Sequence, residues 1–572
     1  MSGSVNNLII LFCVIPLAAG LLSVPLVGRS FPSRVIGTLS FASTFLLAVY
    51  FLLKGHADNV IYTSQMGQWS APFGITIVFD NLSGLLLATA SAVALGSYIH
   101  SHSTNASHIE HGYFHPLIQL LMFGVNLSFL TGDLFNLFVA FEIMLMASYA
   151  LLTIGTTKKQ MAQAYKYVML NLLASTVFVI AAGMAYGMLG TLNMADMALI
   201  VKTKIDSGEG LPTGFTALAL MFLFVFGLKG AFFPLWFWLP DTYYTVPISI
   251  AGLFGGMLTK VGVYAVVRTF PLIFAQSLVG VPEEIAGSLA TRDTMLLIIA
   301  VSAAFTMFLG VLGAVSQHEI RRILSIHVIS QVGYMVFGLA IMTGWALAGC
   351  IFYMIQHMVV KCSLFLCCGI MEKHAGTDDL DKLGGLLKRD TKLAVLFFVA
   401  AMSLVGLPPL SGFFGKMVII WEGWNNNLWW LSIIGLATGA LTLLSMLKIW
   451  SYGFWNPTPA KYPHQTNAKT VIASSRSGYL GISMLVVLAL FLGFGAGPIY
   501  KLADRAGNQL VNPEYYINAV LPPQRIEFIN PEFAQKLKDS KNVIYKTSPL
   551  HDNLGIVSEI PVISAVYNKE AH

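Results

Sequence analysis

Charged side chains are scarce in this sequence. Asp, Glu, Lys and Arg make up 10% of the 572 residues, whereas about 25% is usual in soluble domains. Hydrophobic residues make up 56%, the mean hydropathy is +0.72, and the apolar residues come in long blocks. The composition therefore excludes a soluble protein of this size and predicts a polytopic membrane protein. A net charge of +6 is too small to indicate a nucleic-acid partner.

The sequence also lacks the motifs of cofactor and metal chemistry. Its five cysteines form no CxxC pair and no zinc or iron–sulfur spacing, so we expect buried thiols, with a redox role as the alternative. The segment GFFGKM lacks the spacing of a phosphate-binding loop, and no dinucleotide fingerprint follows a strand. We therefore expect no cofactor and no metal ion.

One histidine-rich segment, HSHSTNASHIEHGYFH, qualifies that expectation. It holds Glu110 and five histidines, which are His100, His102, His108, His111 and His115. These side chains are possible metal ligands, but the composition is more typical of a solvated loop, which is what we expect.

Long apolar runs are what the sequence has in abundance. Because about 20 apolar residues cross a bilayer as a helix, they predict fourteen spans. The N-terminal MSGSVNN lacks the basic region of a signal peptide, so the first span is expected to be retained. Pro234 and the Pro408-Pro409 pair fall inside two spans and predict interrupted helices there. The spans cover roughly residues 8–27, 35–53, 80–99, 115–131, 134–155, 165–189, 213–239, 246–270, 294–315, 320–343, 345–371, 392–422, 427–453 and 478–497.

The positions of Lys and Arg predict how the chain crosses the membrane. With the N-terminus outside, the inner loops hold fifteen of these cations and the outer loops hold only five, Lys54, Lys202, Lys204, Arg268 and Arg292. Since cations concentrate in cytoplasmic loops, we expect both termini to lie on the outer side of the membrane. Residues 499–572 then form an outer extension that packs on a partner or the membrane surface, or is disordered.

Five lysines and one acid remain inside the predicted spans. A lysine at mid-helix costs about 2.5–3.5 kcal/mol, and such residues usually mark ion or proton paths. Burial lowers the pKa of a lysine whereas arginine stays charged, so the use of lysine favours proton transfer. Snorkelling to the interface is the alternative, most plainly for Lys448 near the end of its span. The six residues are Glu142, Lys229, Lys260, Lys361, Lys416 and Lys448.

Two histidines, His327 and His357, join this set. His357 lies four residues before Lys361, so the two share a helix face. Histidine titrates near neutral pH and suits a proton relay. A satisfied helix–helix hydrogen bond is the alternative for each.

The spacing of these residues repeats. Glu142, Lys229 and Lys260 are separated by 87 and 31 residues, and His327, Lys416 and Lys448 by 89 and 32. Each set places its first lysine in a proline-interrupted span, and each unit holds five spans. Because five is odd, consecutive units point in opposite directions, which predicts an inverted repeat of the kind found in many secondary transporters.

Several segments together carry a family resemblance. GLKGAFFPLWFWLPDTYY, LTKVGVYAV, HVISQVGYM, QHMVVKCSLF and LPPLSGFFGKM resemble the antiporter-like subunits shared by respiratory complex I, membrane-bound hydrogenases and Mrp-type cation/proton antiporters. FEIMLMASYALL and LPPLSGFFGK make the chain most similar to the D-type members of the Mrp group. The likeness covers about residues 75–455, and the tail beyond residue 498 is longer than this resemblance implies.

The resemblance implies a fold and a division of the chain. The fold is an all-α polytopic membrane protein with about fourteen transmembrane helices and two inverted five-helix repeats, each containing a broken helix. Three N-terminal helices cover residues 1–114, and the repeats cover 115–270 and 294–453. A last helix follows at 478–497, and the extension covers 499–572.

The resemblance also implies roles for the buried residues. Glu142 is the acid that modulates Lys229, the central proton donor and acceptor. Lys260 and His327 relay the proton, with help from His357 and Lys361, and Lys416 connects to the far side. The set also includes Lys448.

The expected function is therefore proton translocation within a multi-subunit Na⁺(K⁺)/H⁺ antiporter rather than an enzymatic reaction. The expected partners are other membrane subunits, protons, Na⁺ or K⁺, and the bilayer. One alternative is the proton-pumping subunit of a redox-driven complex. Another is a scaffold whose lysines are only buried, paired charges.

Overall fold

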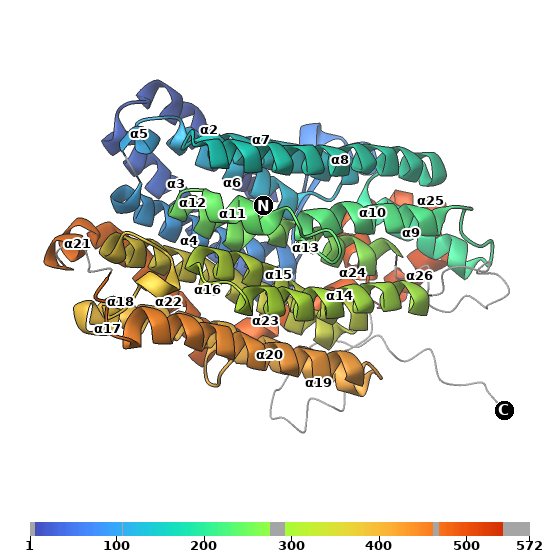
Figure 1. The fold of residues 1–572 in the computed structure, drawn as a ribbon. Helices are drawn as coiled ribbons and strands as arrows, with labels where there is room; N and C mark the ends of the chain where they lie inside the picture. The colour runs from blue at the N-terminus through green and yellow to red at the C-terminus, as the bar shows by residue number, and fades with distance from the viewer. Residues whose placement is uncertain (1–5, 106, 275–291, 462–467, 541–572) are drawn as a thin grey trace.

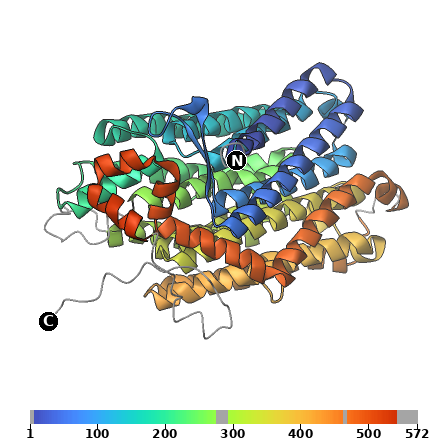
Figure 2. The same cartoon turned by 180° about the vertical axis from the view of Figure 1, so that it is seen from behind.

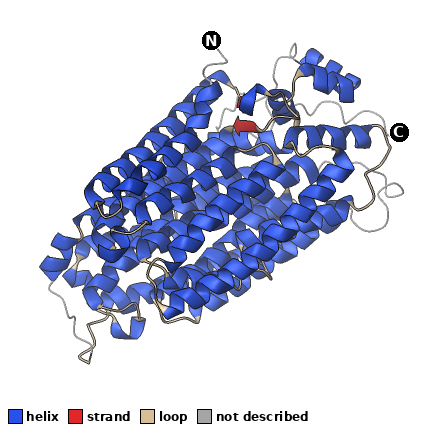
Figure 3. Ribbon diagram, turned by 90° about the horizontal axis from the view of Figure 1, so that it is seen from above, coloured by secondary structure: helices blue, strands red, loops and turns tan. Residues whose placement is uncertain are grey.

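The computed structural model describes residues 6–105, 107–274, 292–461 and 468–540, and helices dominate it (Figure 1). The long helices lie side by side along one common direction, as Figure 3 shows from above. Within these ranges, eleven helices are long and apolar enough to cross a membrane, and three shorter apolar helices cover Phe114–Leu130, Phe215–Gly230 and Thr391–Val405. The prediction of a helical membrane protein is therefore confirmed.

The first part of the chain contains helices and one short hairpin. Strands β1 and β2 pair antiparallel with Tyr62 opposite Phe79, an element that the apolar pattern did not predict. Asp80 caps α4 by accepting a hydrogen bond from the Ser83 backbone N–H at 2.8 Å. The elements are η1 (Leu8–Ile10), α2 (Leu11–Ser23), η2 (Val24–Leu26), α3 (Ser30–Asp58), β1 (Tyr62–Gln65), η3 (Met66–Gln68), β2 (Thr76–Phe79), α4 (Asn81–Thr104), α5 (Ser107–Glu110) and α6 (Phe114–Leu130).

The next part contains the first predicted interruption. Helix α10 ends at Gly230 and the chain resumes as α11 at Leu239, with Pro234 between them. A π-helical turn, η4, separates α12 from α13 within one long buried helix. The elements are α7 (Leu134–Thr153), α8 (Lys158–Leu189), α9 (Met194–Asp206), α10 (Phe215–Gly230), α11 (Leu239–Thr245), α12 (Ile248–Leu253), η4 (Phe254–Leu258), α13 (Thr259–Thr269) and η5 (Phe270–Phe274).

The third part contains the second predicted interruption, between Val405 at the end of α18 and Ser411 at the start of α19. Helices α15 and α16 form the middle of the bundle, and nearly all their side chains are buried. The elements are α14 (Arg292–Val315), α15 (Ile320–Ile341), α16 (Gly344–Ala375), η7 (Leu380–Lys382), α17 (Leu386–Arg389), α18 (Thr391–Val405), α19 (Ser411–Asn425), α20 (Trp429–Trp450) and η8 (Ser451–Trp455).

The described part of the C-terminal extension is helical and packs on the chain itself. Figure 2 shows its last helices against one end of the bundle. Arg525 pairs with the fully buried Asp196 of α9 at 2.9 Å, and Tyr516 and Ile517 are buried. The prediction of disorder is therefore wrong for residues 499–540, and packing on a partner or the membrane surface stays a prediction; residues 541–572 lie outside the described residues. The elements are α21 (Ala468–Ser474), α22 (Arg476–Phe494), α23 (Ala496–Val511), α24 (Glu514–Val520), α25 (Pro523–Ile529) and α26 (Pro531–Ser540).

Arg268 corrects the prediction that the spans hold no arginine. It was expected in an outer loop, but it lies within α13 and is 2% exposed. Its guanidinium donates to both carboxylate oxygens of Asp80 at 2.5 and 2.8 Å. The carboxylate compensates the buried charge, a pairing between distant segments that a positive-inside count does not detect.

Candidate functional site

Lys229 lies in the last turn of α10, directly before the first interruption. The side chain is 5% exposed, and its Nζ lies 5.6 Å from the centre of the Phe141 ring. Helix α13 crosses this point at Gly262, where an added Cβ would lie 2.4 Å from the Gly230 nitrogen. The crossing depends on glycine and brings the backbone of α13 against the turn that carries Lys229.

Glu142 and Lys229 are linked through a third residue, Ser175 of α8. Lys229 Nζ donates to Ser175 Oγ at 3.4 Å, and Ser175 Oγ in turn donates to Glu142 Oε1. The resemblance implied a pair between the acid and the lysine but did not indicate the serine. A hydroxyl that accepts from one group and donates to the other connects the two charges and can pass a proton between them.

Lys260 lies in the first turn of α13 and is fully buried. Its Nζ donates to the Gly255 carbonyl at 2.7 Å and to Thr259 Oγ1 at 3.1 Å. Gly255 belongs to the π-helical turn η4, and such turns frequently occur at functional sites because they alter the helix hydrogen-bond pattern.

Helix α16 carries His357 and Lys361 through the centre of the bundle. Both are fully buried, and neither side chain has a hydrogen-bond partner among the described residues. His357 lies within electrostatic reach of Lys260, Lys361, Lys416 and His327. The histidine therefore has lysines from both predicted repeats, Lys260 and Lys416, within electrostatic reach.

His327 belongs to a polar network that the sequence reasoning missed. Its Nε2 is hydrogen-bonded to the Ser445 hydroxyl of α20. One turn further along α15, Gln331 donates to Thr442 Oγ1 at 3.3 Å and accepts from the Tyr353 hydroxyl. These neutral residues gave no charge signal, and only a search for polar residues at helical spacing within apolar runs could have found them.

Lys416 lies in α19, directly after the second interruption. Its Nζ donates to the carbonyls of Leu404 and Val405 at 2.9 and 3.0 Å, which are the last residues of α18. The Tyr334 ring lies 4.7 Å from the ammonium. The break thus supplies free carbonyls to a buried cation, since the last four carbonyls of a helix have no partner within it.

Lys448, in the last turn of α20, lies apart from the other candidate residues. Its Nζ donates to the carbonyls of Val315 and Gln317, at 3.2 and 2.8 Å, where α14 ends. The interaction resembles a helix C-terminal cap more than a relay position.

The histidine-rich segment is not the solvated loop that was expected. His100 and His115 are buried in α4 and α6, bonded to the Leu366 carbonyl at 3.1 Å and the Tyr98 hydroxyl at 2.6 Å. Glu110 pairs with Arg34 at 2.5 Å. The described part of the chain holds no group of three or more His, Cys, Asp or Glu residues that could bind a metal ion. The five cysteines are free and buried, as predicted.

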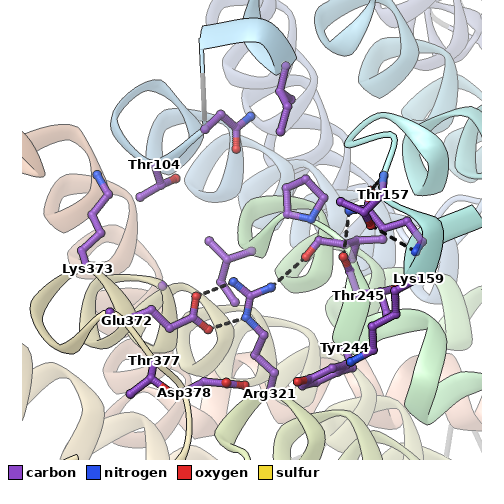
Figure 4. Close-up of a pocket in the computed structure, with 18 residues that line it drawn as sticks. Thr104, Thr157, Lys159, Tyr244, Thr245, Arg321, Glu372, Lys373, Thr377 and Asp378 are labelled. Atoms are coloured by element: carbon purple, nitrogen blue, oxygen red, sulfur yellow. Dashed lines mark hydrogen bonds and ion pairs between the residues drawn. The ribbon is translucent and has the colours of Figure 1, made fainter. Parts of the chain in front are cut away.

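A pocket of about 610 Å³ opens at the end of the bundle where α4, α8, α11, α12, α15 and α16 meet (Figure 4). Arg321 of α15 pairs with Glu372 of α16 in it and donates to the Val246 carbonyl at 3.0 Å. Burial and the Glu372 carboxylate raise the pKa of Asp378, which also lines the pocket. Asn105, at the end of α4, forms part of its wall.

These features define a class of protein. It is a polytopic helical membrane protein whose interior holds a series of ionisable side chains between two interrupted helices. Residues 131–442 match the family described as "NADH:quinone oxidoreductase/Mrp antiporter, TM". The chain belongs to this family of membrane subunits, because the match covers more than half of it and curated relatives align over most of its length.

Two curated relatives and one solved structure place the chain more closely. It is 43% identical to the D-type member of the Na⁺/H⁺ antiporter of Alkalihalophilus pseudofirmus and 36% identical to the Bacillus subtilis protein of the same name. Each alignment covers 90% of this chain and 99% of the relative. A chain in the "Structure of Mrp complex from Dietzia sp. DQ12-45-1b" superposes with a TM-score of 0.79 at 28% identity, over 91% of this chain and 100% of that one.

Proposed function

We propose that this chain is the proton-translocating subunit of a multi-subunit Na⁺(K⁺)/H⁺ antiporter in a bacterial cytoplasmic membrane. The names of the two curated relatives and the fold shared with the Mrp complex chain support this proposal. The observation that carries it is the series of ionisable groups that begins at the half-buried Glu142 and continues past the buried His357 to the buried Lys416. A secondary transporter needs no cofactor, and its protons move between these side chains.

The proposed architecture has fourteen spans with two inverted five-helix repeats, at residues 115–270 and 294–453. Residues 1–114 precede the repeats, and the span 478–497 and the extension 499–572 follow. The eleven long and three shorter apolar helices support this count. Lys229 and Lys416 support the repeat, because they lie 187 residues apart and each lies next to an interruption, Lys229 just before the first and Lys416 just after the second. Both termini lie on the periplasmic side, in accord with the distribution of Lys and Arg.

The proposed mechanism begins at Lys229. The Glu142 charge, transmitted through Ser175, favours the ammonium form of Lys229, and weakening that link favours proton release. The released proton passes to Lys260 and then to the His357–Lys361 pair. His327 and Lys416 carry it towards the far side of the membrane. Lys448 stands outside this sequence of steps.

A partner subunit covers the face of α7 that carries Glu142. Phe135 and Met146 of this helix are 51% and 62% exposed, and the half-buried Glu142 lies between them on the same face. A carboxylate exposed to hydrocarbon is expensive, so lipid does not suit this surface. Another subunit that changes the polarity beside Glu142 would couple cation movement to the proton step at Lys229.

The redox-driven alternative lacks comparable support. The chain's likeness to the "membrane-bound sulfane sulfur reductase" structure rests on 22% identity and concerns the fold alone. The relatives that align at 43% and 36% identity carry antiporter names.

Cation-driven proton movement in inverted membrane vesicles tests the proposal. The intact complex with Lys229→Ala should lose Na⁺- or K⁺-dependent proton flux, whereas Lys204→Ala, at an exposed ion pair, should keep it. Assembly levels must match. Unchanged flux with Lys229→Ala would leave Lys229 a structural residue, and no cation-dependent flux in the wild type would favour redox-driven pumping.

A further inference from the structure

Two tyrosine rings lie over the ammonium group of Lys416. Its Nζ is 4.7 Å from the ring centre of Tyr334 in α15 and 5.7 Å from that of Tyr353 in α16. Both distances fall within the roughly 6 Å over which the negative face of an aromatic ring attracts a cation. The two ring centres lie 5.6 Å apart, and their planes are inclined by 55°. Tyr334 and Tyr353 therefore form an aromatic wedge around one buried lysine.

Each ring of the aromatic wedge is fixed in place through its hydroxyl. Tyr334 donates a hydrogen bond to the Gly435 carbonyl of α20, and Tyr353 donates to Gln331 Oε1 of α15. Both tyrosines are fully buried. Each hydroxyl is thus engaged with another residue, and Lys416 meets the ring faces.

The position of Lys416 beside the wedge depends on two glycines. A Cβ added to Gly415, directly before Lys416, would lie 2.9 Å from Tyr353 Cβ and 3.1 Å from its Cα. In the second interruption, a Cβ added to Gly406 would lie 3.1 Å from Lys416 Cδ, and the φ of Gly406 is +93°. The absence of side chains at these positions lets α19 pack against α16 and lets the lysine stem lie against the interruption.

Lys416 also differs from Lys229 in its electrostatic partners. Lys229 is linked through Ser175 to the carboxylate of Glu142. No carboxylate of the described ranges is paired with Lys416, whose Nζ bonds two carbonyls at the end of α18. An ammonium ion away from water needs compensating negative potential, and the ring faces supply it where no acid does.

We propose that Tyr334 and Tyr353 are positioning residues that set the proton affinity of Lys416, because their ring faces stabilise its ammonium form. The inference rests on the proposed function and deepens it, since it assigns what takes the place of an acid at the second interruption. A ring face attracts a cation but does not take up its proton, so the wedge does not relay the proton itself. A partner subunit can modulate Glu142, whereas two anchored rings give Lys416 a fixed affinity.

Fluorinated phenylalanines at position 334 test the ring contact in the intact complex. The measured quantity is the pH of half-maximal cation-driven proton flux on the alkaline side, where Lys416 gives up its ammonium form. Tyr334→Phe keeps the ring and should keep this midpoint. Mono-, di- and trifluorinated phenylalanine at the same position should lower it stepwise, by about one pH unit over the series, because fluorine withdraws electron density from the ring face. The same series at Tyr353, whose ring is further from Nζ, should give a smaller shift.

Phe337 is the matched control. It is buried on α15, three residues after Tyr334, and its ring lies against Gly423, where an added Cβ would be 2.4 Å from Phe337 Cζ. Gly423 follows Lys416 by seven residues, about 10 Å along α19. The fluorinated series at Phe337 should therefore leave the midpoint unchanged. Fluorinated rings keep nearly the size of phenylalanine, so a stepwise shift does not arise from misfolding.

The outcomes separate the aromatic wedge from the proposed function. A midpoint that stays constant through the Tyr334 series would overturn the wedge and leave the antiporter proposal standing. An equal shift in the Phe337 series would also overturn it, since the effect would not belong to the ring over Lys416. Loss of flux already in Tyr334→Phe would overturn it too, because the hydroxyl and not the ring face would be essential. No exchange in the wild type would overturn the proposed function, and the wedge with it.

Discussion

At the scale of single residues, the buried cations differ in what holds them. Lys229 donates to a serine that is bonded to a carboxylate, whereas Lys416 and Lys448 donate to backbone carbonyls. A carbonyl cannot exchange protons with an ammonium ion, so a lysine held by carbonyls is released only by moving or by deprotonation. The carbonyls that accept from Lys416 lie at a helix interruption, and those that accept from Lys448 lie at a helix end. We therefore predict different effects on proton flux when each of these two lysines is replaced.

Replacement of each lysine by arginine separates titration from charge. Lys416→Arg should keep the positive charge and the carbonyl bonds but lower proton flux by about 100-fold or more, since arginine does not release its proton. Lys448→Arg should keep the flux of the wild type. Vesicle proton-flux assays at matched protein level measure both. Equal behaviour of the two variants would contradict the distinction.

The serine link between Glu142 and Lys229 makes a second prediction at this scale. Ser175→Ala removes the hydroxyl that joins the two charges, and a hydrogen bond to a charged group contributes about 1.5–3 kcal/mol. We expect roughly tenfold lower flux with normal assembly. Thr176→Ala, on the adjacent exposed position where the hydroxyl bonds the Leu172 carbonyl, should have no effect.

At the scale of elements, the helix interruptions bring backbone and cation together only because neighbouring helices approach closely. Gly262 of α13 meets Gly230 at the end of α10, and a Cβ at Gly262 would also lie 2.7 Å from the Lys229 carbonyl carbon. Backbone atoms cannot yield as a flexible side chain does. The position of Lys229 therefore depends on the absence of a side chain on another helix.

Gly262→Ala should destabilise the fold at this crossing. Overpacking of a core commonly costs about 1–3 kcal/mol, so we expect a lower thermal midpoint of the detergent-solubilised complex together with reduced flux. Gly183→Ala on α8, where an added Cβ meets nothing within 4 Å, is the matched control and should be neutral. The thermal midpoints of the two variants, measured side by side, test this prediction.

The sequence predicted the elements better than their contacts. Pro234 and Pro408-Pro409 marked both interruptions, because proline acts locally on its own helix. Arg268 was misplaced and Ser175 was missed, because their roles depend on Asp80 and Glu142, partners 188 and 33 residues away. The network of Gln331 and Tyr353 was missed for the same reason. The free-energy cost of burying a charge indicates which residues need partners. Only the packed structure shows which residues those partners are.

At the scale of the whole molecule, the two ends of the bundle differ. One end opens into the pocket beside Arg321, and the other carries the β-hairpin and the C-terminal helices α24–α26. Thr63 of β1 donates to the Ala519 carbonyl at 3.2 Å, and Asp196 accepts a hydrogen bond from Arg525. The proposed orientation places the first end inside the cell and the second outside.

Thiol labelling tests that orientation. All five native cysteines are buried, so background reaction with an impermeant maleimide should be low. Glu209→Cys, where the native side chain is 67% exposed, should label in intact cells, whereas Asp381→Cys, where it is 61% exposed, should label only in inverted vesicles. The reverse pattern would invert the orientation.

The pair between Asp196 and Arg525 also has a consequence for biogenesis. Its partners lie 329 residues apart, and Asp196 is fully buried. At roughly 5–20 residues per second, the ribosome needs about 15–65 s to make the intervening chain. During that interval the carboxylate of Asp196 lacks its partner Arg525, and helices α24–α26 do not yet cover their end of the bundle. Premature termination before Arg525 leaves that defect permanent, which gives membrane quality control a chemical mark that distinguishes unfinished chains from complete ones.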